Sequence, residues 1–393
     1  MPRPPNLSLQ PIAQPEPANE RMKITDTMTL VVADSQGREL RVKDGGMLGN
    51  KSPHPQASGS DGTPVAANQA TPTSANERTA KPGPEVAAVL NKVSFDDLRI
   101  GEKIGAGSQG SVRKVQSKQT GEIFALKSLT FTNDKEATRE AVHHELVRIE
   151  ALKHDNVVSS YEAFFREGKL YILMEYMDAG TMVSILKRRE KIVGEKNFCG
   201  LPERRIALIA KHLLLGLAHL HASNVVHRDI KPANLLANTK GLAKISDFGV
   251  ASSGESKMHM TTVGSTPYMS PERIKSQPYN TSCDIWSAGL TLAELALGVY
   301  PFGDIKFKIF ELCQLIASGT AAVNWAAPPG GDADRFSPEL KDFVAQCLLP
   351  SETRPGACEL LNHAFVKKAD GVDLVDQGKW FLNPTDDADA KKA

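Results

Sequence analysis

A glycine-rich run followed by a lysine in a short apolar segment is the first feature of this sequence that could do chemistry. The run comprises Gly105, Ala106, Gly107, Ser108, Gln109, Gly110, Ser111 and Val112. Glycines let backbone N–H groups approach phosphate oxygens closely, because no side chain intervenes. Lys127 lies 17 residues beyond Gly110 among apolar residues, where an ammonium group without an anion would be costly. The pattern predicts a phosphate-binding site.

Two other phosphate-binding motifs are excluded. Val112 and Val115 alternate with other residues as in a strand, whereas a dinucleotide-binding glycine motif opens a helix. The phosphate-loop pattern G-x-x-x-x-G-K-S/T does not occur. Lys127 also needs a carboxylate, and a helical pattern at 134–152 offers one. Glu145 lies on the apolar face of that pattern, so we expect a Lys127–Glu145 ion pair.

Three polar clusters follow in a fixed order. The first comprises His227, Arg228, Asp229, Ile230, Lys231, Pro232, Ala233 and Asn234. The second is Asp247, Phe248 and Gly249, and the third is Ser270, Pro271 and Glu272. An Asp-Phe-Gly tripeptide alone would indicate no more than a turn. All three clusters together, after the glycine-rich run and the lysine, are not explained by chance.

In these motifs the sequence resembles the protein kinase family, over roughly residues 98–366. The resemblance implies a bilobal α+β fold that uses ATP and Mg²⁺. It implies that Asp229 accepts the proton of the substrate hydroxyl and that Lys231 neutralises the moving phosphate. Asn234 and Asp247 would hold two Mg²⁺ ions. Phosphoryl transfer depends on positioning and charge neutralisation, which is what these residue types supply.

The same resemblance outlines an ATP site. Lys127 and Glu145 would orient the α- and β-phosphates and complete the catalytic set with Asp229 and Lys231. Met174 would be the gatekeeper, and residues 175–177 would form the hinge that contacts adenine. The residues expected at the nucleotide are Ile104, Gly105, Ala106, Gly107, Ser108, Gln109, Gly110, Val112, Ala125, Lys127, Met174, Glu175, Met177, Asn234, Leu236 and Asp247. Leu236 would form the floor under the purine. Arg354 is expected to pair with Glu272 in a structural role.

The elements that must position these residues form two lobes. Alternating apolar patterns predict strands at 98–104, 111–117, 122–129, 158–165 and 170–175. Helical periodicity is clear at 202–221 and 284–297. We therefore expect a domain at 95–366, with a small β-rich N-lobe at 95–175 that carries one key helix. A larger, mainly helical C-lobe would occupy 178–366.

The first 94 residues differ in composition from the rest. They contain none of the aromatic residues and many of the prolines, so they cannot bury enough apolar surface to offset their ordering entropy. We expect 1–94 to be a disordered tail and linker, most clearly at 45–84. One hairpin is predicted at 28–42, and residues 3–12 are a candidate docking motif, with Arg3 as its one basic residue.

Charge and hydropathy exclude several classes of function. The net charge is +1, so no overall field recruits nucleic acid or an anionic membrane. No apolar stretch approaches the roughly 18 residues of a membrane span. The five cysteines are odd in number and never spaced C-x-x-C, which favours reduced thiols. We expect a cytoplasmic protein, with nuclear entry left open.

A narrower resemblance links the chain to the MAP kinase kinases. The segment 263–274 contains Met-Ser-Pro-Glu-Arg, which is characteristic of that group, and 175–182 is similar to its hinge region. The segment 367–393 is similar to the C-terminal element by which such kinases dock their activators, followed by a polar tail. The resemblance implies dual-specificity transfer to Thr and Tyr of a MAP kinase substrate. It also implies activation by an upstream MAP kinase kinase kinase.

The activation segment departs from the family pattern. Thr261 matches the second family phosphosite, but the first would fall on Lys257 or Glu255, neither of which can be phosphorylated. Ser256 is the nearest hydroxyl and is our candidate. Two alternatives remain for the whole chain: a Ser/Thr kinase that acts on generic substrates, and a pseudokinase scaffold. The C-terminal segment could also be a packing helix followed by a tail.

Overall fold

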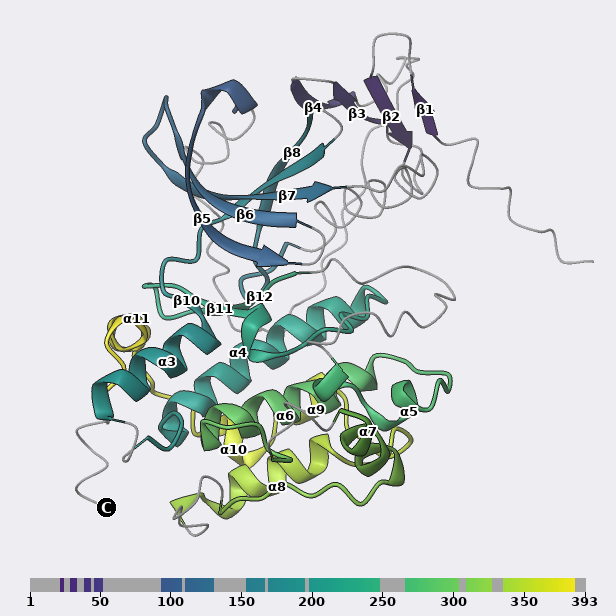
Figure 1. Ribbon diagram of the computed structural model, residues 1–393, viewed down its shortest axis with the longest axis vertical. Coiled ribbons are helices and arrows are strands. Elements are labelled where there is room, and N and C mark those ends of the chain that lie inside the picture. The colour runs from purple at the N-terminus through teal and green to yellow at the C-terminus, as the bar shows by residue number, and fades with distance from the viewer. Residues whose placement is uncertain are drawn as a thin grey trace, which may run out of the picture.

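The β-rich lobe is built on one antiparallel sheet in the strand order β5-β6-β7-β9-β8 (Figure 1). The strands are β5 (Leu98–Gly107), β6 (Gly110–Ser117), β7 (Ile123–Thr130), β8 (Ser160–Arg166) and β9 (Lys169–Glu175). The computed structural model describes residues 22–24, 29–33, 39–43, 46–51, 93–107, 110–130, 153–166, 169–194, 198–247, 266–303, 309–326 and 335–385. Each strand overlaps one that the sequence predicted.

Alternation along β7 places every second side chain in the core of this lobe and the others on the opposite face of the sheet. Phe124 and Leu126 join a buried cluster with Val115, Phe164 and Leu173. Successive side chains of a strand point to opposite faces, so the residues between and beyond them point the other way.

A second antiparallel sheet lies before this lobe in the chain. Its strands are β1 (Met22–Ile24), β2 (Thr29–Ala33), β3 (Glu39–Lys43) and β4 (Gly46–Lys51). The pairing of β2 with β3 coincides with the predicted hairpin at 28–42 except that it extends to Lys43. Strands β1 and β4 lie outside that hairpin, within the stretch 1–94 that the sequence predicted as tail and linker. A lone hairpin leaves edge groups unpaired, and β4 satisfies those of β3.

The larger lobe is helical. Its helices are α3 (Met182–Val193), α4 (Glu203–Ala222), α5 (Pro271–Ile274), α6 (Ser282–Leu297), α7 (Ile309–Ser318), α8 (Pro338–Cys347), α9 (Ala357–Leu360), α10 (Ala364–Lys367) and α11 (Leu374–Leu382). Helices α4 and α6 form the centre of the main apolar core. A side chain at Gly289 of α6 would meet Cβ of Cys347 at 2.5 Å, so this glycine lets α6 and α8 approach closely. The α+β class predicted from the sequence is confirmed.

A three-stranded sheet connects the helical lobe to the hinge. It contains β10 (Gly180–Thr181), β11 (Leu235–Ala237) and β12 (Ala243–Ile245). The segment before β8 is tied to β12: Val158 N–H donates to the Ile245 carbonyl, and Ile245 N–H donates to the Asn156 carbonyl, both at 2.9 Å. The N-lobe sheet is therefore anchored directly on the C-lobe.

The chain end is part of the C-lobe. Helix α11 packs at the hinge side, next to α3 (Figure 1). Trp380 is 5% exposed and Phe381 is fully buried, which confirms the expectation that these aromatic residues need burial. Among the residues that the structure describes, no helix has the length and apolar character that crossing a bilayer requires.

His212 makes the stability of this arrangement dependent on pH. Its Nδ1 accepts the N–H of Ala243 and so joins α4 to β12, and burial lowers the pKa of His212 to about 4. In the unfolded chain this histidine has its ordinary pKa of 6.5, so between pH 6.5 and 4 the unfolded chain binds a proton that the folded protein does not. The contribution of His212 to the free energy of unfolding is therefore complete above pH 6.5 and is lost as pH falls towards 4. We expect about 2 kcal/mol to be lost between pH 7.5 and 5.0 through this residue.

Urea unfolding of the wild type and of His212→Asn at both pH values measures this loss. Asparagine keeps an acceptor but does not titrate, so its stability should fall less over the same interval. Equal losses in the two proteins would contradict the assignment to His212.

Candidate active site

The first polar cluster forms a loop in which two side chains hold one carboxylate. Lys231 Nζ donates to both carboxylate oxygens of Asp229, at 2.9 and 2.8 Å. Asn234 Nδ2 donates to the Asp229 carbonyl and to its Oδ2, each at 2.8 Å. The Asp229 side chain is 14% exposed. Its carboxylate is therefore fixed in direction while part of it still faces outward.

The backbone of this loop rests on a buried carboxylate from α6. Asp284, with no exposed surface, accepts the N–H of His227 and the N–H of Arg228, both at 2.8 Å, and His221 Nε2 lies 3.0 Å from it. Burial by itself would raise the pKa of Asp284, but His221 and His227 outweigh it and hold the pKa below its ordinary value. The carboxylate stays charged, and it holds Arg228 at a φ of 70°, a conformation that non-glycine residues rarely adopt.

His227 links the loop to the segment before Asp247. Its Nε2 donates to the Ser246 carbonyl at 2.9 Å, and its Nδ1 accepts the N–H of Asp229. Burial lowers the pKa of His227, against the smaller opposing effect of Asp284. The neutral imidazole with its proton on Nε2 satisfies both hydrogen bonds. The backbone at Asp229 is thus positioned from two sides.

The register of the N-lobe sheet places four of the expected nucleotide residues on one face. Val112 lies opposite Lys127, and Ala125 lies opposite Met174. Since residues two apart in a strand share a face, all four side chains point the same way. Gly105 lies opposite Val112 on the next strand. The face opposite to the buried N-lobe cluster is therefore the one that the sequence assigned to the nucleotide.

Lys127 and Asp247 connect the two lobes. Lys127 Nζ lies 3.0 Å from Asp247 Oδ1, and the two side chains are 12% and 46% exposed. Asp247 has a φ of 60°, which turns the chain just after β12. The expected partner Glu145 lies outside the described residues, as do Ser108, Gln109, Ser256 and Thr261. The structure thus brings the strand lysine to the second polar cluster.

The hinge is braced from the C-lobe. Lys244 Nζ lies 2.8 Å from Glu175 Oε2, and Glu175 N–H donates to the Ser159 carbonyl. Met177 is 5% exposed, and Leu236 pairs with Thr181 immediately beyond the hinge. Exposed Ile104 lies on β5 near the glycine-rich turn. Sequence reasoning missed Lys244, because a single lysine in a short strand gives no signal of a partner 69 positions away.

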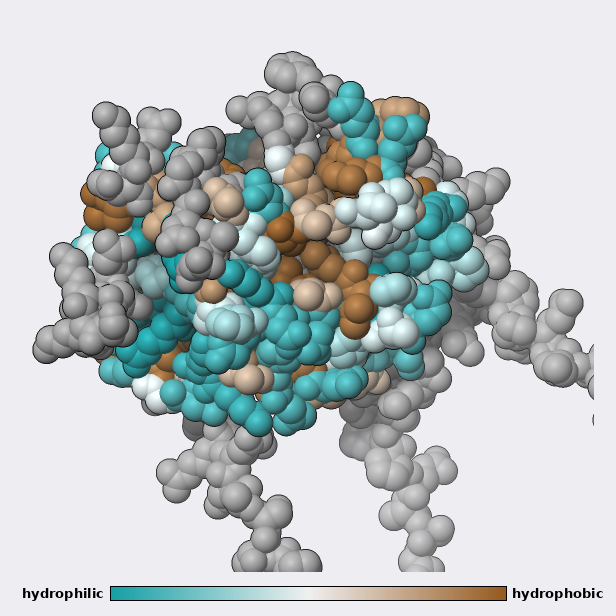
Figure 2. Space-filling model, turned by 90° about the horizontal axis from the view of Figure 1, so that it is seen from below, coloured by the Kyte–Doolittle hydropathy of each residue, from teal (hydrophilic) through white to brown (hydrophobic). Residues whose placement is uncertain are grey.

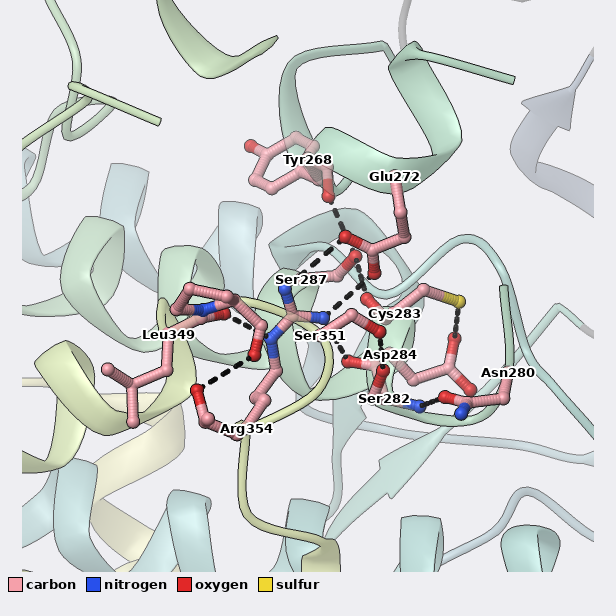
Figure 3. Close-up of polar contacts among 12 residues, drawn as sticks. Tyr268, Glu272, Asn280, Ser282, Cys283, Asp284, Ser287, Leu349, Ser351 and Arg354 are labelled. Carbon is pink, nitrogen blue, oxygen red and sulfur yellow. Dashed lines mark hydrogen bonds and ion pairs between the residues drawn. The ribbon is translucent and has the colours of Figure 1, made fainter. Parts of the chain in front are cut away.

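The third polar cluster forms the ion pair that the sequence predicted. Arg354 Nη1 lies 2.9 Å from Glu272 Oε1 and also donates to the Ser282 carbonyl, while its Nε donates to the Leu349 carbonyl (Figure 3). Burial raises the pKa of Glu272, but Arg354 outweighs it and leaves the pKa below its ordinary value. This pair is confirmed as structural, and it fixes α5 next to α6.

Asn234 and Asp247 fit a divalent cation by the chemistry of their oxygens. Asn234 uses its amide nitrogen towards Asp229, so its carbonyl oxygen is the group that it can offer to a metal. Asp247 supplies a carboxylate, and Mg²⁺ prefers such hard oxygen ligands with water and phosphate completing its shell. Among the described residues, no group of three or more His, Cys, Asp and Glu side chains could hold a metal by itself.

Comparison with known proteins gives the class. The family model for the protein kinase domain matches residues 98–366, and the chain belongs to the protein kinase family. It is also similar to MAP kinase kinases. Mitogen-activated protein kinase kinase 1 of Arabidopsis thaliana is 36% identical over 305 residues, which cover 75% of this chain and 81% of that protein. Both resemblances stated from the sequence motifs are confirmed.

Two further relatives extend this similarity. Mitogen-activated protein kinase kinase SIPKK of Nicotiana tabacum is 38% identical over 302 residues, covering 75% of this chain and 80% of that protein. MAP kinase kinase PBS2 of Saccharomyces cerevisiae is 34% identical over 297 residues, which cover 72% of this chain and 42% of that protein. The family as a whole uses ATP and Mg²⁺, so these are the cofactors expected for this chain.

Replacing the buried carboxylate should disable the site. In Asp284→Asn, one of the two accepting oxygens becomes an NH₂ group that faces a donor in a buried position. We expect a loss of about 3 kcal/mol in the free energy of unfolding and a large fall in kcat. The matched control is Asp342→Asn, since Asp342 also pairs with a histidine, at 2.9 Å, but is 60% exposed. Wild-type stability and kcat in Asp284→Asn would contradict the anchoring role.

Proposed function

We propose that this chain is a MAP kinase kinase that transfers the γ-phosphoryl group of ATP to Thr and Tyr in the activation loop of a MAP kinase. One observation carries the catalytic part: the partly exposed carboxylate of Asp229 is held by both Lys231 and Asn234. A lysine and a second carboxylate, Lys127 and Asp247, meet across the lobes. Similarity to named MAP kinase kinases supports the narrower assignment.

In this proposal each residue acts at a stated atom. The Asp229 carboxylate orients the substrate hydroxyl and accepts its proton as the oxygen attacks the γ-phosphorus. The Lys231 ammonium neutralises charge on the moving phosphoryl group, and Lys127 holds the α- and β-phosphates. Asn234 and Asp247 would hold Mg²⁺, which supplies charge neutralisation at the β- and γ-phosphates. Met174, Glu175, Met177 and Leu236 would enclose the adenine.

Regulation follows the family resemblance. We propose activation by a MAP kinase kinase kinase through phosphorylation of Thr261 and Ser256. A phosphate at Thr261 would find its cation in Arg228, the residue held in place by Asp284. The upstream kinase would dock on the C-terminal element around α11, where Leu374, Val375 and Leu382 are exposed. We further propose a cytoplasmic location.

A folded protein as substrate is supported by the surface of the C-lobe. Helix α7 exposes Phe310 by 71%, together with Ile309 and Leu315. Seen from below, the molecule has apolar side chains gathered near the centre of a largely hydrophilic face (Figure 2). Exposed apolar surface of this kind is typical of protein–protein contacts.

The deciding experiment uses an activated variant and two substrates. Thr261→Glu combined with Ser256→Glu should phosphorylate a folded, catalytically inactive MAP kinase on both Thr and Tyr, with little transfer to a generic basic protein. Introduced carboxylates carry part of the charge of phosphate. The matched control carries Thr261→Gln and Ser256→Gln, which are similar in size but uncharged. Transfer to Ser and Thr of the generic protein, with the MAP kinase ignored, would contradict the assignment and indicate a general Ser/Thr kinase.

Catalysis itself is tested at Asp247. Asp247→Asn removes the charge that we assign to Mg²⁺, so phosphoryl transfer should fall by about 10³-fold or more. Exposed Asp342→Asn serves again as the control for a lost carboxylate. Full signalling by the Asp247→Asn protein in cells would favour the scaffold alternative.

A further inference from the structure

Helix α11 is pressed against the turn that joins β11 to β12. A Cβ atom at Gly378 would lie 1.9 Å from the Thr239 carbonyl oxygen, so only glycine permits this approach. A Cβ at Gly241, which has a φ of 83°, would lie 2.1 Å from the Leu374 carbonyl oxygen. The helix and the turn therefore meet backbone to backbone at two glycines. Such a contact transmits small shifts, because no flexible side chain lies between the two elements.

The turn leads directly into the nucleotide site. Strand β11 carries Leu236, the expected floor under the purine, and it begins next to Asn234. Strand β12 ends two residues before Asp247. Antiparallel pairing of β11 with β12 makes this hairpin one rigid unit. The position of the turn thus sets the position of the floor.

A second connection runs from α11 to the hinge. Arg188 Nη2, on α3, donates to the Ala179 carbonyl at 2.6 Å and to the Phe381 carbonyl at 3.0 Å. Asp178, next to Ala179, accepts both the N–H and the hydroxyl of Thr239, at 2.7 and 2.6 Å. Hinge, turn and α11 therefore form one closed set of contacts.

Helix α11 is held on the C-lobe by specific polar contacts as well as by apolar packing. Arg205 is 6% exposed; its Nη1 donates to Gln377 Oε1 at 3.1 Å and lies 2.7 Å from Asp376 Oδ2. Its guanidinium also lies over the Trp380 ring, 5.2 Å from the centroid. These contacts give α11 one defined position on α4. A displaced helix would lose all of them together.

We propose that α11 is a positioning element of the nucleotide site, with Gly378 and Arg188 as its positioning residues. The seated helix fixes the purine floor and the hinge, and so sets the affinity for the adenine nucleotide. By linkage, a bound nucleotide stabilises the seated helix, and a partner that displaces α11 weakens nucleotide binding. The inference depends on the kinase fold and holds whether or not the substrate is a MAP kinase.

The first test is Gly378→Ala. Alanine favours helix formation over glycine, so the substitution strengthens α11 itself while its Cβ forces the helix off the turn. We expect the KM for ATP and the Kd for ADP to rise by about fivefold or more, with kcat within about twofold of wild type. A purely structural defect would lower the active fraction, which reduces kcat and leaves KM unchanged. Gly356→Ala is the matched control, since nothing lies within 4 Å of its Cβ.

A second variant keeps the test decisive if Gly378→Ala does not fold. Arg188→Met retains the apolar stem and removes both hydrogen bonds to the hinge and α11, and it should raise the same two constants. Lys187→Met, an exposed neighbour on α3, is its control. Hydrogen exchange gives an independent readout: MgADP should slow exchange of the α11 amides in the wild type. Wild-type KM and Kd in both variants, or α11 exchange that ignores MgADP, would overturn the proposal.

Discussion

A single buried carboxylate, Asp284, supports the geometry on which the whole site depends. It accepts the backbone N–H groups of His227 and Arg228 and forces Arg228 into a left-handed conformation. That conformation costs on the order of 1–3 kcal/mol and persists only because its surroundings over-determine it. The next residue in the chain is Asp229. The strain is therefore located immediately before the carboxylate that we assign to proton transfer.

The β11–β12 hairpin connects the catalytic residues to the rest of the molecule. Its strands lie between the 227–234 loop, the hinge and α11. Strand β12 also forms backbone hydrogen bonds with residues 156–158, which lead into the N-lobe. Lys244 reaches from it to the hinge carboxylate of Glu175. The two lobes are thus coupled through short strands and backbone hydrogen bonds. Elements joined by backbone contacts can move little relative to one another. A shift of an element far from the phosphates, such as α11, can therefore change the affinity for the nucleotide.

The sequence predicted most of the fold and the residue types of the site. The five strands of the N-lobe were visible as alternating patterns, and α4 and α6 as helical periodicity, because both depend on local burial along one element. The Glu272–Arg354 pair was also predicted, from the family resemblance. Strands β1 and β4 were not predicted: β1 has only three residues, the glycines and polar residues of β4 give no alternation, and each pairs at an outer edge of the β2–β3 hairpin.

What the sequence by itself determined is the inventory: a glycine-rich turn, a strand lysine and three polar clusters in a fixed order. Chain order and residue type can be taken directly from the sequence, and phosphoryl transfer needs these residue types, so they indicate a kinase. What only the tertiary structure decided is which groups meet. The contacts of Lys244 with Glu175, of Arg188 with Phe381 and of Gly378 with the 238–241 turn join segments that no local pattern relates. They arise because packing of the two lobes and of α11 brings these segments side by side, and buried polar groups then pair with the partners that packing places next to them.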